Sequence, residues 1–382
     1  FYAEVKEMKT IVSLSLEPTD VILFKPDGKI PHSFMKYGYK PFLVSYNEIR
    51  DLTYLDDVVK GLNIIKIKKY FNSRFVSGAI YLLKESKNIN ILHFMFCTRM
   101  NLILSFLYKT INKNGKVYIA CDLNDGCIEL FEKAMKKKLI RKIEKIFYKK
   151  IDLISCESLT IKEEIEKNNY IPNIKYVPFG IDTPMPNMDF EKRENIILTC
   201  GRIGHYLKNN EMLVESYVSS PLIYQNYELH LIGSFTEEFE QYINKLKENN
   251  SIFNNKIKLI GPIYERKKLY EYMAKSKIFI MTSRLESFCF AMWEAAACGC
   301  YIVSTNFSPA KDITQNGSIG TLVKNEDIDD LRKKLEKILQ NTEEIQIKAK
   351  RCSEFVLSNY TWSAVCDKAA KYLKIKEVEH GK

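Results

Sequence analysis

Residues 277–305 read KIFIMTSRLESFCFAMWEAAACGCYIVST, and this stretch decides the fold class. Its two ends, 277–283 and 300–305, are short apolar runs, which are typical of strands buried on both faces. The residues between them follow a helical pattern. A strand, a helix and a second strand in this order indicate a parallel sheet with a crossover helix.

The same alternation extends over the rest of the chain. In the second half we predict further strands at 196–203, 227–233 and 256–261, with helical patterns between them. The first half is less regular, and its predicted strands are TIVSLSL, KPFLVSY, NIIKI, NILHFMF, KVYIACD and DLISCES. A chain of 382 residues exceeds the usual size of one hydrophobic core. We therefore predict an α/β protein with two Rossmann-like domains facing a cleft, with ligands bound beyond the carboxyl ends of the strands.

A proline-bearing polar stretch at 183–194 is the predicted linker between the domains. It separates an N-terminal domain at 1–182 from a C-terminal domain at 195–360. The last helical pattern, roughly 341–376, is long enough to return to the first domain. We therefore assign residues 361–382 to a C-terminal helix and tail.

The bulk composition predicts a globular protein of a reducing compartment. The ten cysteines form no C-x-x-C pair, so neither a zinc site nor a disulfide framework is expected. No apolar run approaches the roughly eighteen residues that span a bilayer, and the first twenty residues do not resemble a secretory signal. We expect a cytoplasmic location. Nearly all of the net charge of +11 lies in residues 1–180, which should influence the partners of that half.

Two carboxylates stand out in the stretch that decides the fold. Glu286 follows a predicted strand directly, and Glu294 comes eight residues later in the helical run. Ionised carboxylates accept several hydrogen bonds, so the pair suits two neighbouring sets of sugar-like hydroxyls. The backbone N–H groups of the loop, at a helix N-terminus, would meet an anion such as a diphosphate. The predicted ligand-binding residues of this loop are Ser287, Phe288 and Cys289.

A second constellation lies in CGRIGHYLKNNEMLVES, residues 200–216. Gly201 and Arg202 leave a predicted strand, and Lys208 and Asn209 precede a helix. Two cations and a tight turn at one strand end suit a diphosphate leaving group. At an effective dielectric near 20, one cation about 4 Å from a phosphate oxygen gives roughly 4 kcal/mol. This attraction grows as charge builds on the departing phosphate, so it favours the transition state.

These two elements resemble the signature of glycosyltransferase family 4, whose members are retaining enzymes of GT-B fold. The E-x7-E pair and the G-R…K-N element occur in order with LHLIG, IKLIGPI, SIGTLV and a terminal YTW. VPFGID at 177–182 resembles the family's V-P-N-G-I-D block, with Phe179 in place of asparagine.

The resemblance implies a role for each residue of the second half. Gly201, Arg202, Lys208 and Asn209 would form the donor-binding G-R…K-N element, in which Arg202 and Lys208 bind the diphosphate. Glu286 would bind the sugar hydroxyls and Glu294 the ribose. Arg202, Lys208 and Glu286 would be catalytic. The donor would be a UDP-sugar, with GDP as the open alternative, and no cofactor or metal ion would be needed. The implied mechanism is front-face displacement with retention, in which the departing phosphate assists deprotonation of the acceptor.

The first half resembles the family less. Residues 25–40, KPDGKIPHSFMKYGYK, occupy the place of its glycine-rich loop and are similar to a form found in polysaccharide-assembly members, so Gly28 is a predicted donor-binding residue. Many members have a histidine at the end of a later strand, where YIACDLND here offers Asp122. Asp122 is therefore a candidate catalytic residue, with helix or turn capping as the alternative. His93 fits a core position better than a site.

Residues 133–150, KAMKKKLIRKIEKIFYKK, hold nine basic residues and one acidic residue. Apolar residues recur at helical spacing, which predicts a basic amphipathic helix. Such a helix suits an anionic membrane surface or a lipid-diphosphate acceptor, and a merely solvated face is the alternative. Nucleic acid is disfavoured because no nucleic-acid motif accompanies the charge.

Taken together, the sequence predicts a retaining, metal-independent hexosyltransferase. It would move a sugar from a UDP-sugar to a glycan, glycolipid or other cell-surface acceptor, in the cytoplasm or on the inner face of the cell membrane. Two alternatives remain. One is a nucleotide-sugar epimerase or hydrolase on the same scaffold, and the other is a non-catalytic partner subunit of a glycosyltransferase.

Overall fold

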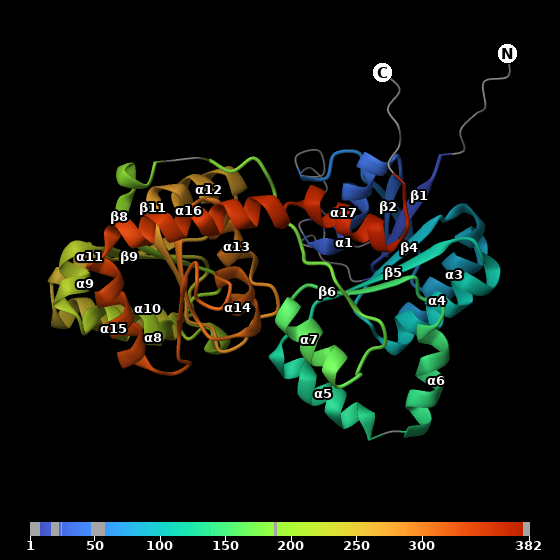
Figure 1. Cartoon of the computed structure of the whole chain (residues 1–382), viewed down its shortest axis with the longest axis horizontal. Helices are drawn as coiled ribbons and strands as arrows, with labels where there is room; N and C mark the ends of the chain where they lie inside the picture. Colours follow the sequence, from blue (N-terminus) through green and yellow to red (C-terminus); the bar gives the residue numbers. More distant parts are fainter. Residues whose placement is uncertain are drawn as a thin grey trace, which may run out of the picture. The chain divides into compact units, whose positions relative to one another are not determined.

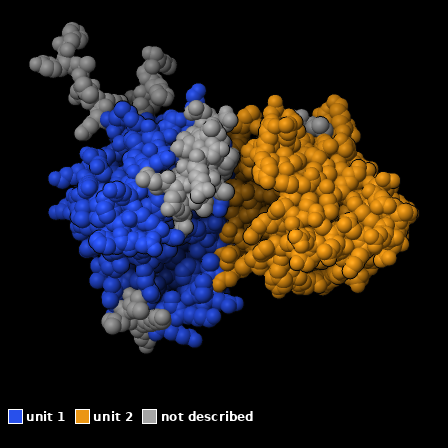
Figure 2. Space-filling view, turned by 180° about the vertical axis from the view of Figure 1, so that it is seen from behind, with its two compact units in different colours: residues 1–123, 127–180, 362–382 blue, residues 124–126, 181–361 orange. Residues whose placement is uncertain are grey.

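The computed structural model describes residues 8–16, 23, 25–46, 58–136, 138–186 and 189–376. The chain divides into two compact units, which Figure 2 distinguishes by colour. The first unit comprises residues 1–123, 127–180 and 362–382, and the second comprises 124–126 and 181–361. Each unit contains one parallel sheet flanked by helices (Figure 1), so the predicted α/β class with two Rossmann-like domains is confirmed.

The sheet of the first unit has seven strands in the order β3-β2-β1-β4-β5-β6-β7. The strand bounds are β1 Thr10–Leu14, β2 Lys40–Tyr46, β3 Asn63–Ile67, β4 Ile91–Met95, β5 Lys116–Cys121, β6 Leu153–Cys156 and β7 Lys175–Tyr176. Because β1 pairs in parallel with both β2 and β4, the strand order reverses between β1 and β4. Such a reversal is the usual ligand position of an open α/β sheet.

The helices of the first unit follow these strands. They are α1 Pro26–Ser33, α3 Arg74–Glu85, α4 Arg99–Ile111, α5 Asp125–Met135, α6 Lys138–Tyr148, α7 Leu159–Lys167 and α17 Trp362–Tyr372. The residues before helices α3, α4 and α7 cap them, because the hydroxyls of Ser73, Thr98 and Ser158 accept backbone N–H groups of the first turn. Short 3-10 turns cover Phe34–Tyr37 and Ser86–Asn88.

The second unit repeats this plan with six strands in the order β10-β9-β8-β11-β12-β13. The strands are β8 Glu194–Cys200, β9 Glu228–Ile232, β10 Ile257–Gly261, β11 Ser276–Met281, β12 Tyr301–Thr305 and β13 Thr321–Val323. The helices are α8 Asn210–Val218, α9 Pro221–Asn226, α10 Glu237–Asn249, α11 Ile252–Lys256, α12 Arg266–Lys275, α13 Phe290–Ala297, α14 Ser308–Thr314, α15 Ile328–Leu339 and α16 Thr342–Asn359. Here the reversal falls between β8 and β11.

The predicted return of the C-terminal helix to the first domain is confirmed. The helical pattern at 341–376 is two helices, because α16 ends at Asn359 and α17 begins at Trp362. Helix α17 belongs to the first unit, where it packs against α1. The Tyr37 hydroxyl donates to the Asp367 carboxylate at 2.6 Å, which fixes this contact.

Two further predictions are corrected. Residues 25–40 are not a glycine-rich loop, because Pro26, at the first position of α1, favours the helix. Residues 133–150 are not one helix, since α5 ends at Met135 and α6 begins at Lys138. Helix α6 packs instead against α4, with the Phe147 ring edge-on to Phe106 at 5.5 Å between centroids.

His93 lies in the middle of β4 and is fully buried. Its Nδ1 is 2.9 Å from the Ser13 hydroxyl of β1. Burial lowers the pKa of His93 to about 3, so the ring is neutral. The interpretation of His93 as a core residue is confirmed. Among the residues that the structure describes, no helix has the length and apolar character needed to cross a membrane.

Candidate functional site

The predicted residues of the second half gather at the carboxyl ends of β8 and β11. The loop after β8 carries Gly201, Arg202 and Lys208, and the loop after β11 carries Glu286. The two loops are joined by their backbones, because Arg284 N donates to Leu207 O at 2.8 Å. The site therefore forms at the strand-order reversal of the second sheet.

Lys208 and Glu286 are in direct contact. The Lys208 Nζ donates to Glu286 Oε1. The same oxygen accepts a hydrogen bond from the Ser283 hydroxyl at 2.6 Å. The lysine is held from its own backbone as well, since its carbonyl accepts from Thr282 Oγ1 at 3.1 Å. Both charged side chains are mostly buried, at 16% and 12% exposure, so the surrounding protein restricts the geometry of the pair.

The turn after β8 depends on two glycines. Gly201 N donates to Ile232 O at 2.9 Å, which ties this turn to the end of β9. A Cβ at Gly233 would lie only 1.7 Å from Gly201 O, so no residue with a side chain fits there. Arg202 follows at once and is exposed. Among the described residues no carboxylate forms a salt bridge with Arg202, and solvent reaches its side chain.

Asn209 has a structural role that the sequence did not reveal. Its backbone is left-handed, with φ 48°, where it connects the 3-10 turn Tyr206–Lys208 to α8. Its side chain is buried, donates to Glu326 Oε2 at 3.2 Å and accepts from Arg284 Nη2 at 3.1 Å. These bonds fix the end of the loop that carries Lys208. Donor binding by Asn209 itself stays a prediction.

Glu294 lies on α13 and is only 2% exposed. Its Oε1 accepts from Arg266 Nη2 and from the Tyr270 hydroxyl, the latter at 3.3 Å, and both partners belong to α12. Burial raises the pKa of Glu294, and Arg266 opposes this shift. Arg266 was not predicted as a site residue, although it opens the helix that follows IKLIGPI. Arg266 and Glu294 are 28 positions apart, so their pairing could not be predicted from the local sequence.

The thiol of Cys200 lies at the end of β8, near members of both ion pairs. Burial raises its pKa to about 12, and the charges of Glu294, Arg266 and Lys208 also act on it. Both pairs are therefore within electrostatic range of one strand end. Of the predicted side chains, Lys208 and Glu286 are in contact with each other, whereas Glu294 pairs with Arg266.

The three loop residues before α13, Ser287, Phe288 and Cys289, differ in burial and in the chemistry of their side chains. Phe288 is buried and stacks on Trp293 at 5.2 Å between ring centroids, so its side chain packs the core. Cys289 is left-handed, with φ 61°, and burial raises its pKa well above the usual range, so it is a neutral thiol. Ser287 is half-buried. Their backbone N–H groups, ahead of α13, are what an anion would meet.

Gly28 and Asp122 belong to the first unit. Gly28 is buried within α1, and a Cβ there would lie 2.8 Å from Leu23 O, so packing alone demands a glycine. Asp122 follows β5 and raises the pKa of two buried acids, Asp27 and Glu157, in addition to the larger effect of their burial. The sequence analysis missed both, although Asp27 precedes Gly28 and Glu157 directly follows β6. The catalytic role of Asp122 stays a prediction.

The chemistry of the second unit follows from these contacts. A mostly buried cation and carboxylate stand together at one strand end, and an exposed guanidinium lies in the same turn. A second carboxylate, held by an arginine, lies near the same strand end. Cations recognise phosphate and carboxylates recognise hydroxyls, so the arrangement suits a phosphorylated sugar or nucleotide.

Comparison with known protein families identifies relatives of the second unit. Residues 182–356 match the family Glycosyl transferases group 1. The second unit is a group 1 glycosyl transferase domain. This group corresponds to the family 4 that the sequence resembles, so the predicted family is confirmed. Every residue of the Lys208–Glu286 and Arg266–Glu294 pairs lies inside this glycosyl transferase domain.

The likeness extends beyond the glycosyl transferase domain. An uncharacterized glycosyltransferase of Methanocaldococcus jannaschii is 24% identical over 365 residues, which cover 91% of this chain and 87% of that protein. The capsular polysaccharide biosynthesis glycosyltransferase CapH of Staphylococcus aureus is 24% identical over 269 residues, covering 68% and 72%. The structure of Anabaena HepE in complex with UDP superposes with a TM-score of 0.70 at 13% identity, covering 96% and 99%. At this identity the last likeness concerns the fold.

Proposed function

We propose that the protein is a retaining glycosyltransferase that moves a hexosyl group from a UDP-sugar to a glycan or glycolipid acceptor. The observation that carries the proposal is the Lys208–Glu286 pair at the reversal of the second sheet. It places a cation beside a carboxylate, inside a domain whose family transfers sugars.

In the proposed reaction Lys208 and Arg202 bind the diphosphate, and Glu286 accepts hydrogen bonds from the donor sugar. The acceptor hydroxyl oxygen bonds to the anomeric carbon as the bond between sugar and phosphate breaks, and the hydroxyl proton passes to the departing diphosphate. The two cations stabilise the negative charge that builds on this diphosphate. Glu294, which Arg266 and Tyr270 orient, accepts a ribose hydroxyl. The resident charges of the chain supply the electrostatic stabilisation, so we propose transfer without a metal ion.

Two relatives support the proposed substrates. HepE of Anabaena, which shares the fold, is solved with UDP. CapH of Staphylococcus aureus is named for capsular polysaccharide biosynthesis. These names favour UDP over GDP in the donor and a glycan or lipid-linked glycan as the acceptor.

We also propose that the first unit contacts an anionic membrane surface through α6. Ile143 and Ile146 are 48% and 55% exposed on this helix. Exposed lysines 142, 145 and 149 flank them. Apolar side chains between cations suit the interface of an anionic bilayer, where each cation contributes about 1 kcal/mol.

The test is incubation of the purified full-length chain with UDP-, GDP- and ADP-sugars and a mixture of oligosaccharides, with and without EDTA. Release of UDP together with an α-linked product from an α-linked donor supports the proposal. An altered sugar still attached to UDP would identify an epimerase. Absence of turnover with every donor, together with tight binding to another transferase, would identify a partner subunit.

A further inference from the structure

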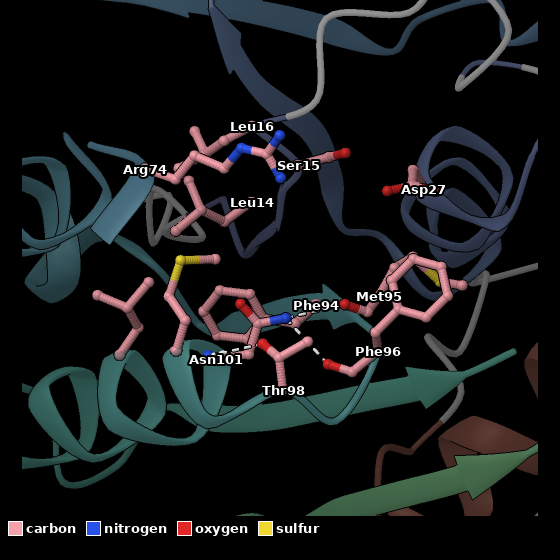
Figure 3. A pocket seen from close by; sticks show the side chains of 12 residues that line it. Leu14, Ser15, Leu16, Asp27, Arg74, Phe94, Met95, Phe96, Thr98 and Asn101 are labelled. Atoms are coloured by element: carbon pink, nitrogen blue, oxygen red, sulfur yellow. Dashed lines mark hydrogen bonds between the residues drawn. The ribbon is translucent and has the colours of Figure 1, made fainter. Parts of the chain in front are cut away.

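A pocket of about 120 Å³ opens in the first unit where β1 and β4 end (Figure 3). Leu14, Ser15 and Leu16 line it where β1 ends, and Phe94, Met95 and Phe96 line it where β4 ends. This is the point where the strand order of the first sheet reverses. It corresponds in position to the reversal in the second sheet that carries Lys208 and Glu286, and nothing described so far uses it.

Phe96 has a strained backbone at the rim of this pocket. Its φ is 67°, a left-handed conformation that a bulky residue rarely adopts. The ring is 48% exposed, so the strain does not serve to bury it. Strained residues persist where the surrounding structure holds them, and they concentrate at ligand sites.

Asn101 holds Phe96 in this conformation. Its buried side-chain amide donates to Met95 O at 2.8 Å and to Phe96 O at 2.9 Å. Phe96 N donates to Ala120 O at 2.8 Å, which adds a third constraint. Thr98, the first turn of α4 and Asn101 all follow within five residues (Figure 3). These bonds thus hold the backbone from which the Phe96 ring projects at the edge of the pocket.

The other lining residues are chemically mixed. Met95, Met100 and Leu104 give apolar surface, whereas Asp27 and Arg74 add polar groups. Asp27 is buried, and burial raises its pKa, which a hydrogen bond from Ser15 opposes. In Figure 3 the Phe96 ring and the Asp27 carboxyl are on the same side of the pocket. A ligand here would meet an aromatic face and a carboxyl together.

A pyranose ring has this double character. Its axial C–H groups form an apolar face that packs on the electron-rich face of an aromatic ring. Its hydroxyls donate to a carboxyl. A volume of about 120 Å³ accommodates part of one such ring, so the remainder of a larger glycan would stay in solvent.

We propose that this pocket binds one sugar unit of the acceptor, with Phe96 as the stacking platform and Asp27 as the hydroxyl acceptor. The proposal rests on the proposed glycosyltransferase function. Phe96 is then a specificity-determining residue that selects acceptors with an unobstructed C–H face. The positioning residue is Asn101, which acts through the backbone of Phe96.

The test is saturation-transfer NMR on the full chain, with methyl α-glycosides of glucose, galactose, mannose and N-acetylglucosamine as probes. We expect transfer to the ring C–H protons of at least one probe with the wild type and with Phe96→Trp. We expect its loss with Phe96→Ala and Phe96→Gly. Phe71→Ala is the matched control, because Phe71 is also an exposed, left-handed phenylalanine, at 88% exposure and φ 51°, and does not line the pocket.

Melting temperatures separate binding from folding. Phe96→Gly should melt above Phe96→Ala, because glycine relieves the left-handed backbone while both variants lack the ring. Equal transfer in wild type and Phe96→Ala, or no transfer to any probe with the wild type, overturns the proposal. The shift of the melting temperature by UDP, measured on the same samples, tests the donor side independently. Its absence would contradict the proposed function and leave the sugar pocket standing.

Discussion

The ammonium of Lys208 donates a hydrogen bond to the Glu286 carboxylate, which joins residues 78 positions apart. Each partner emerges from a different strand end, and Ser283 and Thr282 hold the carboxylate and the lysine backbone in place. A cation and a hydroxyl acceptor are thereby preorganised side by side. Preorganised charges stabilise a transition state without the cost of reorienting solvent.

Replacing Lys208 should therefore impair catalysis more than folding. For Lys208→Ala we expect kcat to fall on the order of a hundredfold, as for other groups that stabilise transition-state charge. The measurement is initial-rate release of UDP from the preferred donor. Lys333→Ala, which removes an exposed lysine of α15, is the matched control. A fall below about threefold in a folded variant would refute the role of Lys208.

Removing Arg266 should leave the buried Glu294 carboxylate without its charged partner. For Arg266→Ala we expect a loss of about 1–3 kcal/mol in the free energy of unfolding, measured by urea denaturation. The loss should be larger at high pH, because burial already raises the pKa of Glu294 and protonation removes its need for a cation. Arg266→Lys should recover part of the stability. A loss independent of pH would argue against the ion pair as its cause.

Glu157 predicts a pH dependence of stability. Burial raises its pKa in the folded protein, so the folded state keeps a proton that the unfolded chain releases above about pH 4.3. This carboxyl therefore lowers stability as the pH rises. Glu157→Gln keeps the acceptor for Leu123 N, at 2.6 Å in the wild type, and removes the titration.

The melting temperature of Glu157→Gln relative to wild type should increase between about pH 5 and pH 8. Glu163→Gln, at an exposed position of α7, should follow the wild-type curve. Parallel curves for Glu157→Gln and the wild type would contradict a buried protonated carboxyl.

Membrane contact through α6 can be tested by vesicle sedimentation. Vesicles with anionic lipid should bind the protein, and added salt should weaken the binding. Reversing the charges at Lys142, Lys145 and Lys149 to Glu should abolish it. Ile347→Ser, which changes an exposed apolar residue of α16, should have no effect. Equal binding to neutral vesicles would remove the electrostatic explanation.

The sheets could be predicted from the sequence because their strands are buried on both faces and appear as short apolar runs. The run 277–283 and β11, Ser276–Met281, differ by only one or two residues at each end. The helix boundaries could not be predicted from the sequence where tertiary contacts determine them. The helical pattern at 133–150 is continuous in sequence, yet Phe147 packs on Phe106 and α6 is a separate helix.

The candidate site could be predicted only in part from the sequence, for a related reason. Lys208 and Glu286 each lie in the loop that follows a predicted strand, so the topology of a parallel sheet brings the two loops together. Arg266 carries no such local signal, because its importance comes from a contact with a residue on another helix. The left-handed backbone of Phe96 could not be predicted from the sequence either, since phenylalanine gives no indication of positive φ.

The close packing at Gly233 makes this position sensitive to substitution. Because Gly233 has no side chain, the carbonyl of Gly201 can lie close beside it. Gly233 itself carries no side-chain group that a substrate could contact. One added methyl group would displace the turn from which Arg202 projects. A variant that has lost activity can therefore carry its substitution at a position without any reactive group, and a search confined to charged residues would overlook it.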